Sequence, residues 1–203
     1  MTIRIRAIYL TILVWAVMAM PQWQAGAAAQ ETDAAAENRA PFSLIDQNGR
    51  AVTDRDFAGS FMLIFFGYTY CPDICPTDLT VMSEAVDLLG EAGDVVQPIF
   101  ITIDPTRDTA EVMAAYVKHF HPRLVGLTGT SEQISAIGAR YGVQAQRYQA
   151  EAASEPADDE YYLDHTGAMY LLGPNGEGLT YFQHGMPAAD IAATIQQFID
   201  QIS

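Results

Sequence analysis

The chain has 203 residues, of which half are hydrophobic and 17% are charged, so it has enough apolar material for one globular core. That composition excludes collagen, coiled coil and disorder as descriptions of the whole chain. Ten basic residues, with Lys118 as the single lysine, stand against 25 acidic residues and give a formal net charge of −15, which makes nucleic acid and anionic membrane surfaces poor partners.

The N-terminal 29 residues predict an export segment. Two arginines precede an uncharged stretch whose strongly apolar part, residues 7–20, is shorter than the roughly 20 residues of a membrane span. Small residues at 25–29 favour a cleaved signal peptide over residues 1–29, with an uncleaved membrane anchor as the alternative. Either would export the chain, to the bacterial periplasm in our interpretation. Residues 30–40 are polar and alanine-rich, and we expect a flexible tether to one domain over residues 41–203.

A hairpin, a buried strand and a helix are the first predicted elements of that domain. Residues 42–46 and 51–53 flank Asn48-Gly49, the strongest short hairpin signal. Residues 61–66 form a continuous apolar run, which is typical of a strand covered on both faces. Helical spacing follows over residues 77–89, and Pro76, which is tolerated only in a first helical turn, places the start of this helix.

Strands and helices then alternate. Apolar, β-rich segments predict strands over residues 95–103, 123–127, 143–149, 168–172 and 179–183. Two four-residue patterns, Asp108-x-x-Glu111 and Thr130-x-x-Gln133, have the form of capping boxes and predict helices between these strands, and a last helix is expected after Pro187. This order indicates an α/β domain with a mixed central sheet flanked by helices and an N-terminal hairpin.

The two cysteines of the chain, Cys71 and Cys75, lie between the predicted buried strand and the helix that Pro76 begins. Unpaired backbone N–H groups and the positive end of the helix dipole favour a thiolate there, which lowers the cysteine pKa and predicts reactive thiols. A static disulfide is one interpretation, although so short a loop contributes little stabilising entropy. Redox chemistry and metal binding are the others, and two thiolates with one imidazole could hold Cu(I) or Cu(II).

Four histidines are candidates to complete a metal site. His119 and His121 fall at the end of a predicted helix, where an imidazole meets the negative end of the dipole, and this favours a structural role. His184 forms a His-x-Met pair with Met186 that could also hold copper. His165 lies between an acidic loop, residues 151–160, and a strand, and its role stays open from the residue pattern alone.

Other candidate ligands receive a structural interpretation. Asp73, Asp78 and Asp104 lie in or beside the motif segments, and we expect solvated or capping residues, with Asp104 also a candidate for docking a partner or supporting the site. Four methionines on predicted apolar faces are expected in the core rather than as copper ligands. They are Met62, Met82, Met113 and Met169.

Four segments resemble, in order, the markers of the Sco/SenC family of copper-binding proteins. They are residues 66–77 (FGYTYCPDICPT), 103–109 (IDPTRDT), 126–129 (GLTG) and 164–166 (DHT). The resemblance covers essentially the whole exported domain. It implies a thioredoxin-like fold and one copper ion, Cu(I) or Cu(II), bound by Cys71, Cys75 and His165. In related thioredoxin-like folds the segment before a strand that faces the active-site helix packs against the cysteines, and His165 falls near that position.

The resemblance also implies a function. Sco/SenC proteins take part in assembly of the dinuclear copper (CuA) centre of cytochrome c oxidase, so the expected partners are subunit II of the oxidase, a periplasmic copper donor and a thiol reductant. Transfer by ligand exchange needs no catalytic base, so a chaperone is expected rather than an enzyme. The main alternative is a thiol-disulfide oxidoreductase that uses Cys71 and Cys75 as a redox pair to reduce the oxidase's copper-ligand cysteines. A peroxidase of the thioredoxin superfamily and a redox or copper sensor are further alternatives.

Overall fold

The computed structural model describes residues 41–143, 145–148, 161–165 and 167–202. Three predicted segments lie outside the described residues: the signal peptide over residues 1–29, the tether over residues 30–40 and the acidic loop over residues 151–160. No helix within the described ranges is long and apolar enough to cross a membrane.

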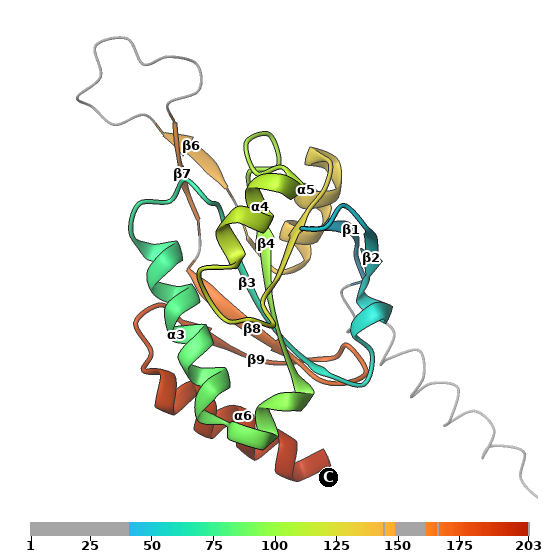
Figure 1. Ribbon diagram of the computed structural model, residues 1–203, viewed down its shortest axis with the longest axis vertical. Helices are drawn as coiled ribbons and strands as arrows, with labels where there is room; N and C mark the ends of the chain where they lie inside the picture. Colours follow the sequence, from blue (N-terminus) through green and yellow to red (C-terminus); the bar gives the residue numbers. More distant parts are fainter. Residues whose placement is uncertain (1–40, 144, 149–160, 166, 203) are drawn as a thin grey trace, which may run out of the picture. The chain divides into compact units, whose positions relative to one another are not determined.

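A mixed sheet of seven strands, in the order β2-β1-β5-β4-β3-β8-β9, forms the centre of the domain (Figure 1). Its strands are β1 (Ser43–Asp46), β2 (Ala51–Thr53), β3 (Phe61–Gly67), β4 (Val96–Thr102), β5 (Val125–Thr128), β8 (Ala168–Leu172) and β9 (Gly178–Gln183). Strands β6 (Gln146–Tyr148) and β7 (Tyr162–Asp164) pair with each other in a separate two-stranded sheet. The predicted mixed sheet and N-terminal hairpin are confirmed.

Strand β3 is an interior strand of the sheet, between β4 and β8, and every one of its residues is buried. It runs parallel to β4, with Phe65 opposite Phe100, and antiparallel to β8, with Phe65 opposite Met169. A strand with sheet neighbours on both edges and side chains covered on both faces needs no polar residue, which explains the unbroken apolar run. The four methionines expected in the core are all buried there, each at most 3% exposed.

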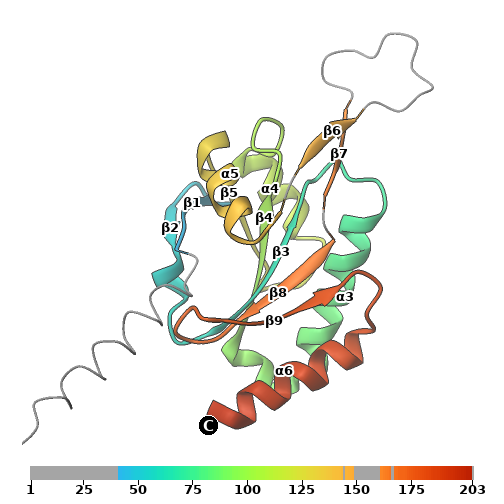
Figure 2. The ribbon, with the colours of Figure 1, turned by 180° about the vertical axis from the view of Figure 1, so that it is seen from behind.

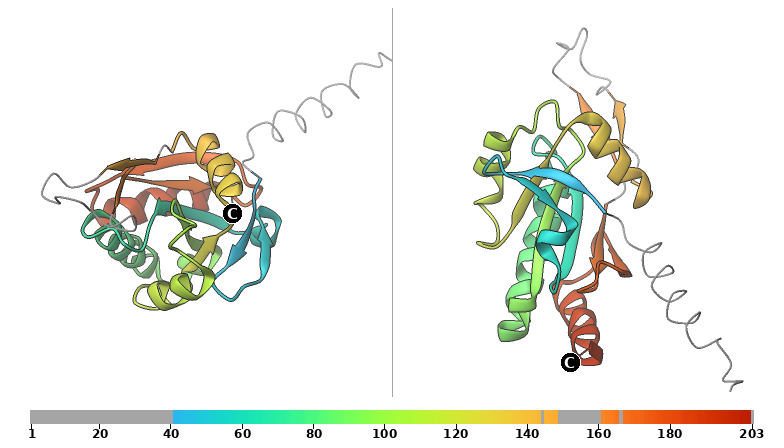
Figure 3. Two further views of the ribbon diagram at one scale, coloured as in Figure 1. Left: turned by 90° about the horizontal axis from the view of Figure 1, so that it is seen from above. Right: turned by 90° about the vertical axis from the view of Figure 1, so that its right-hand side faces the viewer.

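In the part of the chain that the structure describes, four α-helices cover the sheet, and two 3-10 helices lie between β2 and β3 and between α3 and β4. They are α3 (Ile74–Leu88), α4 (Ala110–Val117), α5 (Ser131–Arg140), α6 (Ala188–Ile202), η1 (Asp54–Phe57) and η2 (Gly90–Val95). Helix α3 packs against α6, and α4 packs over β5. Helices α4 and α5 lie on opposite sides of the sheet (Figure 3), and α5 is on the near side in the view from behind (Figure 2). Each face of the central strands therefore has a helical cover.

The two predicted capping boxes have different outcomes. At α5 the box is confirmed, because the Thr130 hydroxyl accepts from the Gln133 N–H and the Gln133 side chain accepts from the Thr130 N–H. At α4 the predicted cap is wrong by one residue, since Thr109 caps the helix by accepting from the Val112 N–H. Asp108 is buried instead.

Two further boundaries differ from the sequence predictions. Helix α3 begins at Ile74 rather than near Pro76, so that Cys75 lies inside its first turn. The strand predicted over residues 143–149 is described only as β6, and its partner is β7 rather than the central sheet. Both differences concern candidate ligands. Cys75 lies in the first turn of α3, and β7, the partner of β6, leads directly to His165.

Candidate metal centre

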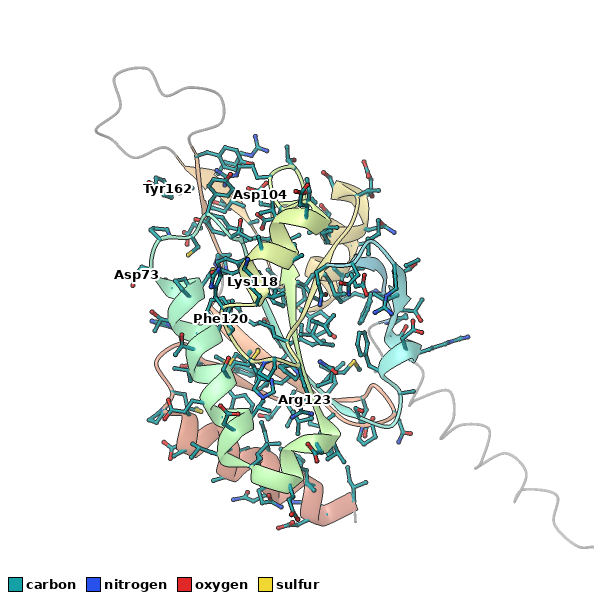
Figure 4. All side chains as sticks on the ribbon, in the orientation of Figure 1. Asp73, Asp104, Lys118, Phe120, Arg123 and Tyr162 are labelled. Carbon is teal, nitrogen blue, oxygen red and sulfur yellow. The ribbon has the colours of Figure 1, made fainter. Side chains whose placement is uncertain are left out.

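The candidate site lies where β3, α3 and β7 meet. Cys71 is in the short loop that follows β3, Cys75 is the second residue of α3, and His165 directly follows β7. The carboxyl ends of parallel strands are common binding positions in α/β sheets, since the loops that leave them converge. In Figure 4 the labelled residues Asp73 and Tyr162 mark the start of α3 and the strand β7 at this end.

Cys71, Cys75 and His165 form one cluster of potential ligands. One ligand atom from each residue lies within 4.8 Å of the other two, and the Cys75 Sγ and His165 Nε2 atoms are 3.5 Å apart. Both cysteines are free thiols, with Cys71 partly exposed and Cys75 buried. Two sulfur atoms and one imidazole nitrogen at this spacing could hold a soft or borderline ion. Cu(I) is such an ion, and these three ligands are enough to bind it.

The two thiols have opposite ionisation preferences. A hydrogen bond from the Cys75 side chain lowers the pKa of Cys71 to about 3, helped by His165 and by the backbone N–H groups of Asp73 and Cys75, although burial opposes the shift. The pKa of Cys75 is raised because its thiol donates to Cys71 and because it is buried. The metal-free site therefore holds one thiolate and one thiol, so binding of a metal to both sulfur atoms releases a proton.

Gly67 makes the close approach of Cys75 to β3 feasible. A Cβ atom at this position would lie 2.7 Å from the Cys75 Sγ and 3.0 Å from the Phe100 ring. Real Cβ atoms do not approach a sulfur so closely, and neither neighbour is free to move in a dense core. The glycine at the end of β3 is thus a requirement of the site and was not identified from the sequence.

His165 is held against the core by aromatic rings. Its imidazole makes edge contacts with Tyr68 and Phe65, at centroid distances of 6.1 Å and 6.3 Å. The Tyr68 hydroxyl accepts a hydrogen bond of 3.1 Å from the Leu163 N–H, which ties β7 to the loop that carries Cys71. The predicted approach of His165 to the cysteines, across 90 residues of sequence, is therefore observed in the fold.

Asp104 corrects one expectation about the acidic residues. It is buried, and its carboxylate accepts hydrogen bonds from the Tyr161 hydroxyl at 2.7 Å and the Arg107 Nε at 2.5 Å. The Arg107 guanidinium also lies 3.6 Å from the centre of the Tyr161 ring. Asp104 supports the segment that leads into β7 and is neither solvated nor a helix cap. Arg107 lies in a family marker, but no sequence signal pairs it with Tyr161.

Asp78 corrects a second expectation. It is buried in α3, and its Oδ1 lies 2.9 Å from the Nδ1 of His184. Asp73, by contrast, is exposed at the start of α3 and makes no side-chain capping bond, as a solvated residue would. His184 is outside the Cys71, Cys75 and His165 cluster.

The other two histidines stay away from the cluster. Helix α4 ends at Val117, so His119 and His121 follow the helix rather than forming its last turn. His119 is exposed, whereas His121 is buried and its Nδ1 accepts a hydrogen bond from the Arg123 N–H. Their predicted exclusion from the site agrees with this placement, although the helix ends earlier than expected.

Comparison with known proteins gives a consistent family match. The family model described as SCO1/SenC matches residues 30–200. Protein SCO1 homolog, mitochondrial, of Mus musculus is 46% identical over 157 residues, which are 76% of this chain and 54% of that protein. Protein sco1 of Schizosaccharomyces pombe is 44% identical over 158 residues, 77% of this chain and 59% of that protein. The chain thus spans little more than half the length of these relatives.

Two solved structures with copper bound are similar to the whole described domain. Arabidopsis thaliana ScoI with copper bound has a TM-score of 0.72 and 35% identity, and the match covers 81% of this chain and 99% of that one. Bradyrhizobium japonicum ScoI with copper bound has a TM-score of 0.70 and 39% identity, with coverages of 79% and 98%. These similarities confirm the predicted thioredoxin-like fold and support copper as the metal that suits the Cys/Cys/His cluster.

The predicted bacterial periplasmic location is contradicted by the comparisons. The mouse relative and its human counterpart, which is 43% identical over 157 residues, are both named mitochondrial. The prediction rested on residues 1–29, which precede both the described residues and the family match over residues 30–200.

Proposed function

Because this chain belongs to the SCO1/SenC family, we propose that it is a copper chaperone that holds one copper ion through Cys71, Cys75 and His165 and assists assembly of the CuA centre of cytochrome c oxidase. The observation that carries the proposal is the convergence of these three side chains, from segments 90 residues apart, to within 4.8 Å. Copper is the cargo in this proposal, and subunit II of the oxidase is its acceptor.

The geometry suggests how the residues would take up the ion. Cys71 is the partly exposed residue and already a thiolate, so it meets incoming copper first. Cys75 then gives up its proton and becomes the second sulfur ligand, and the imidazole of His165 is 3.5 Å from that sulfur. Three protein ligands leave room for a thiolate of the acceptor, and exchange of ligands one at a time would move the ion without a free intermediate.

Loading depends on the redox state of the two cysteines. A disulfide between Cys71 and Cys75 could not supply two thiolates, so copper binding requires the reduced form that the structure describes. A copper donor and a thiol reductant therefore belong to the proposed cycle as partners.

A thiol-disulfide oxidoreductase is the second candidate, and the asymmetry of the two thiols favours it. The Cys71 thiolate would attack a disulfide of the target, forming a mixed disulfide and releasing one target thiolate, which takes up a proton. Cys75 would then lose its proton, attack Cys71 and release the second target thiol. The target gains two electrons and two protons, the Cys71–Cys75 pair is oxidised, and an external thiol reductant restores it.

Copper binding by matched variants separates the two candidates. The reduced protein is compared with His165→Ala, with Cys71→Ser/Cys75→Ser and with the control His119→Ala, which changes an exposed histidine outside the cluster. We expect one copper per chain in the unmodified protein and the control, with sulfur and imidazole ligation in the X-ray absorption spectrum. Both site variants should lose or degrade this signal.

The opposite result would support the oxidoreductase. In that case the unmodified protein would reduce a disulfide in the copper-free acceptor domain of subunit II, hold copper only weakly, and respond equally to His165→Ala and His119→Ala. Transfer of copper from the loaded protein to the reduced acceptor domain tests the chaperone role itself, and copper that stays on the loaded protein would contradict it.

A further inference from the structure

A second histidine lies beside the candidate copper site without belonging to it. His184 is in the turn that follows β9, where Gly185 has a φ of +83° and the Met186 N–H donates to the Gln183 carbonyl at 3.2 Å. The turn keeps the His184 imidazole at the surface, with 47% of its side chain exposed. Met186 packs against the hydrophobic core, so the His-x-Met pair does not present both side chains outward.

A backbone hydrogen bond to Gly167 connects His184 to the segment that carries His165. The His184 N–H donates to the Gly167 carbonyl at 2.9 Å, and Gly167 is two residues beyond His165. A Cβ atom at Gly167 would lie 3.4 Å from the His184 Cβ and 3.7 Å from the Asp78 Oδ2. His184 and Asp78 therefore flank the segment that carries His165, and Asp78 is itself three residues from Cys75 on α3.

Asp78 fixes which nitrogen of His184 is available. Its Oδ1 lies 2.9 Å from the His184 Nδ1. This contact engages Nδ1, so Nε2, on the other side of the ring, is the nitrogen left to act as a ligand. No hydrogen bond to Nε2 is found among the described residues. A histidine held in this way by a carboxylate is the usual arrangement of an imidazole metal ligand, because the hydrogen bond orients the ring and increases its basicity.

The burial of Asp78 explains why its contact with the His184 imidazole is kept. Asp78 is 3% exposed on its side chain, and its second oxygen, Oδ2, has no hydrogen-bond partner among the described residues. Burial raises the pKa of Asp78, and the hydrogen bond with His184 opposes the shift. The contact with His184 is therefore the main polar compensation for a buried carboxyl group, which keeps the imidazole in place.

We propose that His184 is an auxiliary copper ligand, which receives copper through Nε2 before the ion moves to Cys71, Cys75 and His165. The inference rests on the proposed function, because it assigns a route to the same site. One imidazole, with water or a ligand of the copper donor in the other positions, holds copper less tightly than two sulfur atoms and an imidazole. Movement from His184 to the neighbouring cluster is therefore favourable, and the surface position makes the nitrogen accessible to a donor.

The first test removes the thiolate site and titrates what is left with Cu(II). In Cys71→Ser/Cys75→Ser/His165→Ala, we expect one weakly bound Cu(II) with nitrogen hyperfine coupling from an imidazole in the electron paramagnetic resonance spectrum. Adding His184→Ala should weaken it at least tenfold, and adding Asp78→Asn should weaken it by a similar factor, since outer partners of metal-bound histidines change affinity about 10–100-fold. Adding His119→Ala, the matched exposed histidine, should change nothing.

Two results would overturn the inference: affinity for Cu(II) that is unchanged by His184→Ala, or affinity that falls equally with His119→Ala. Circular dichroism and thermal unfolding show whether each variant is folded. Where Asp78→Asn unfolds the chain, His184→Ala alone decides, because it truncates a side chain that is half exposed.

The second test measures loading in a chain whose thiolate site is intact. With His184→Ala, the copper–sulfur absorption should appear several-fold more slowly after mixing with Cu(I), while the final content stays at one copper per chain. An unchanged rate would overturn the loading role. If the unmodified protein forms no copper–sulfur bonds, the proposed function fails, whereas the titration of the thiolate-free variant still reports on His184 independently.

Discussion

At the residue scale, the two cysteines differ because of what surrounds them. Cys71 accepts hydrogen bonds and is partly exposed, whereas Cys75 donates to Cys71 and is buried beneath Gly67. A thiolate is stabilised at the first position and a thiol at the second. The same asymmetry would serve metal loading and disulfide exchange, which is why the two candidate functions share their residues.

Alkylation of the reduced protein tests this asymmetry. Cys71 has its pKa lowered to about 3, so it should react with iodoacetamide at a nearly constant rate between pH 5 and 8. An ordinary cysteine, with a pKa of about 8.5, would slow tenfold for each pH unit in that range. Peptide mapping by mass spectrometry gives the rate for each cysteine, and Cys75 should be modified far more slowly. Equal rates for the two cysteines would contradict the assignment.

Gly67→Ala tests the packing beneath Cys75. The added methyl group would lie 2.7 Å from the Cys75 Sγ and 3.1 Å from the Phe65 ring, so one of them must move. We expect the free energy of unfolding to fall by about 1–3 kcal/mol, as overpacked cores show, and copper affinity to fall with it. Urea unfolding and competition with a copper chelator measure the two effects.

The matched control for this substitution is Gly178→Ala in β9, where no atom lies within 4 Å of the added Cβ. It should leave both quantities nearly unchanged. A Gly67→Ala protein with the stability and copper affinity of this control would show that β3 has space next to Cys75 and that the close contact is unimportant.

At the scale of the elements, the residue before the cap of α4 is hydrogen-bonded to the loop that carries Cys71. Asp108 precedes the cap, and its buried carboxylate accepts hydrogen bonds from the N–H and hydroxyl groups of Thr69 and from the Thr102 hydroxyl, at 2.5–3.0 Å. Thr69 lies two residues before Cys71. The residue that sequence spacing offers as the cap thus ties the cysteine loop to β4.

Two substitutions distinguish these roles. Thr109→Ala removes the observed cap of α4 and should lower the free energy of unfolding by about 1 kcal/mol. Asp108→Ala should lower it by about 2 kcal/mol or more, because it leaves buried donors of Thr69 and Thr102 without an acceptor. Urea unfolding gives both values. The reverse order would mean that Asp108 is the cap and that its buried contacts are weak.

At the scale of the whole molecule, the cluster of Cys71, Cys75 and His165 is separate from the packing of α3 against α6. The cluster uses only the first turn of α3, whereas α6 packs against this helix and buries its own residues Ile191 and Ile195 completely. Stability and metal binding should therefore respond to different substitutions, as long as the chain stays folded.

Ile195→Ala tests this separation. The cavity it leaves should lower the free energy of unfolding by about 2–5 kcal/mol, while the folded protein still binds one copper. Gln197→Ala, on the exposed side of the same helix, is the control and should change stability by less than about 0.5 kcal/mol. Denaturation and copper analysis of the same samples provide both readings. Loss of copper from folded Ile195→Ala would show that α6 also shapes the site.

The sequence by itself determined the features that depend on neighbouring residues. Asn48-Gly49 predicts the hairpin and Thr130-x-x-Gln133 the cap of α5, since turns and caps form between residues a few positions apart. The apolar run over residues 61–66 predicts β3, because an unbroken run of apolar residues is also a local pattern. The family markers added the ligand set, which pattern alone left open at His165.

Only the tertiary structure decided the contacts between distant segments. His165 meets Cys75 across 90 residues, Tyr161 meets Asp104 across 57, and His184 meets Asp78 across 106. Such pairs are set by the order of strands in the sheet and by how its layers pack, and no local pattern encodes them. The sequence predicts Asp78 and Asp104 as solvated or capping residues and Asp108 as a cap for this reason, whereas the fold buries all three and brings hydrogen-bond partners to them from elsewhere in the chain.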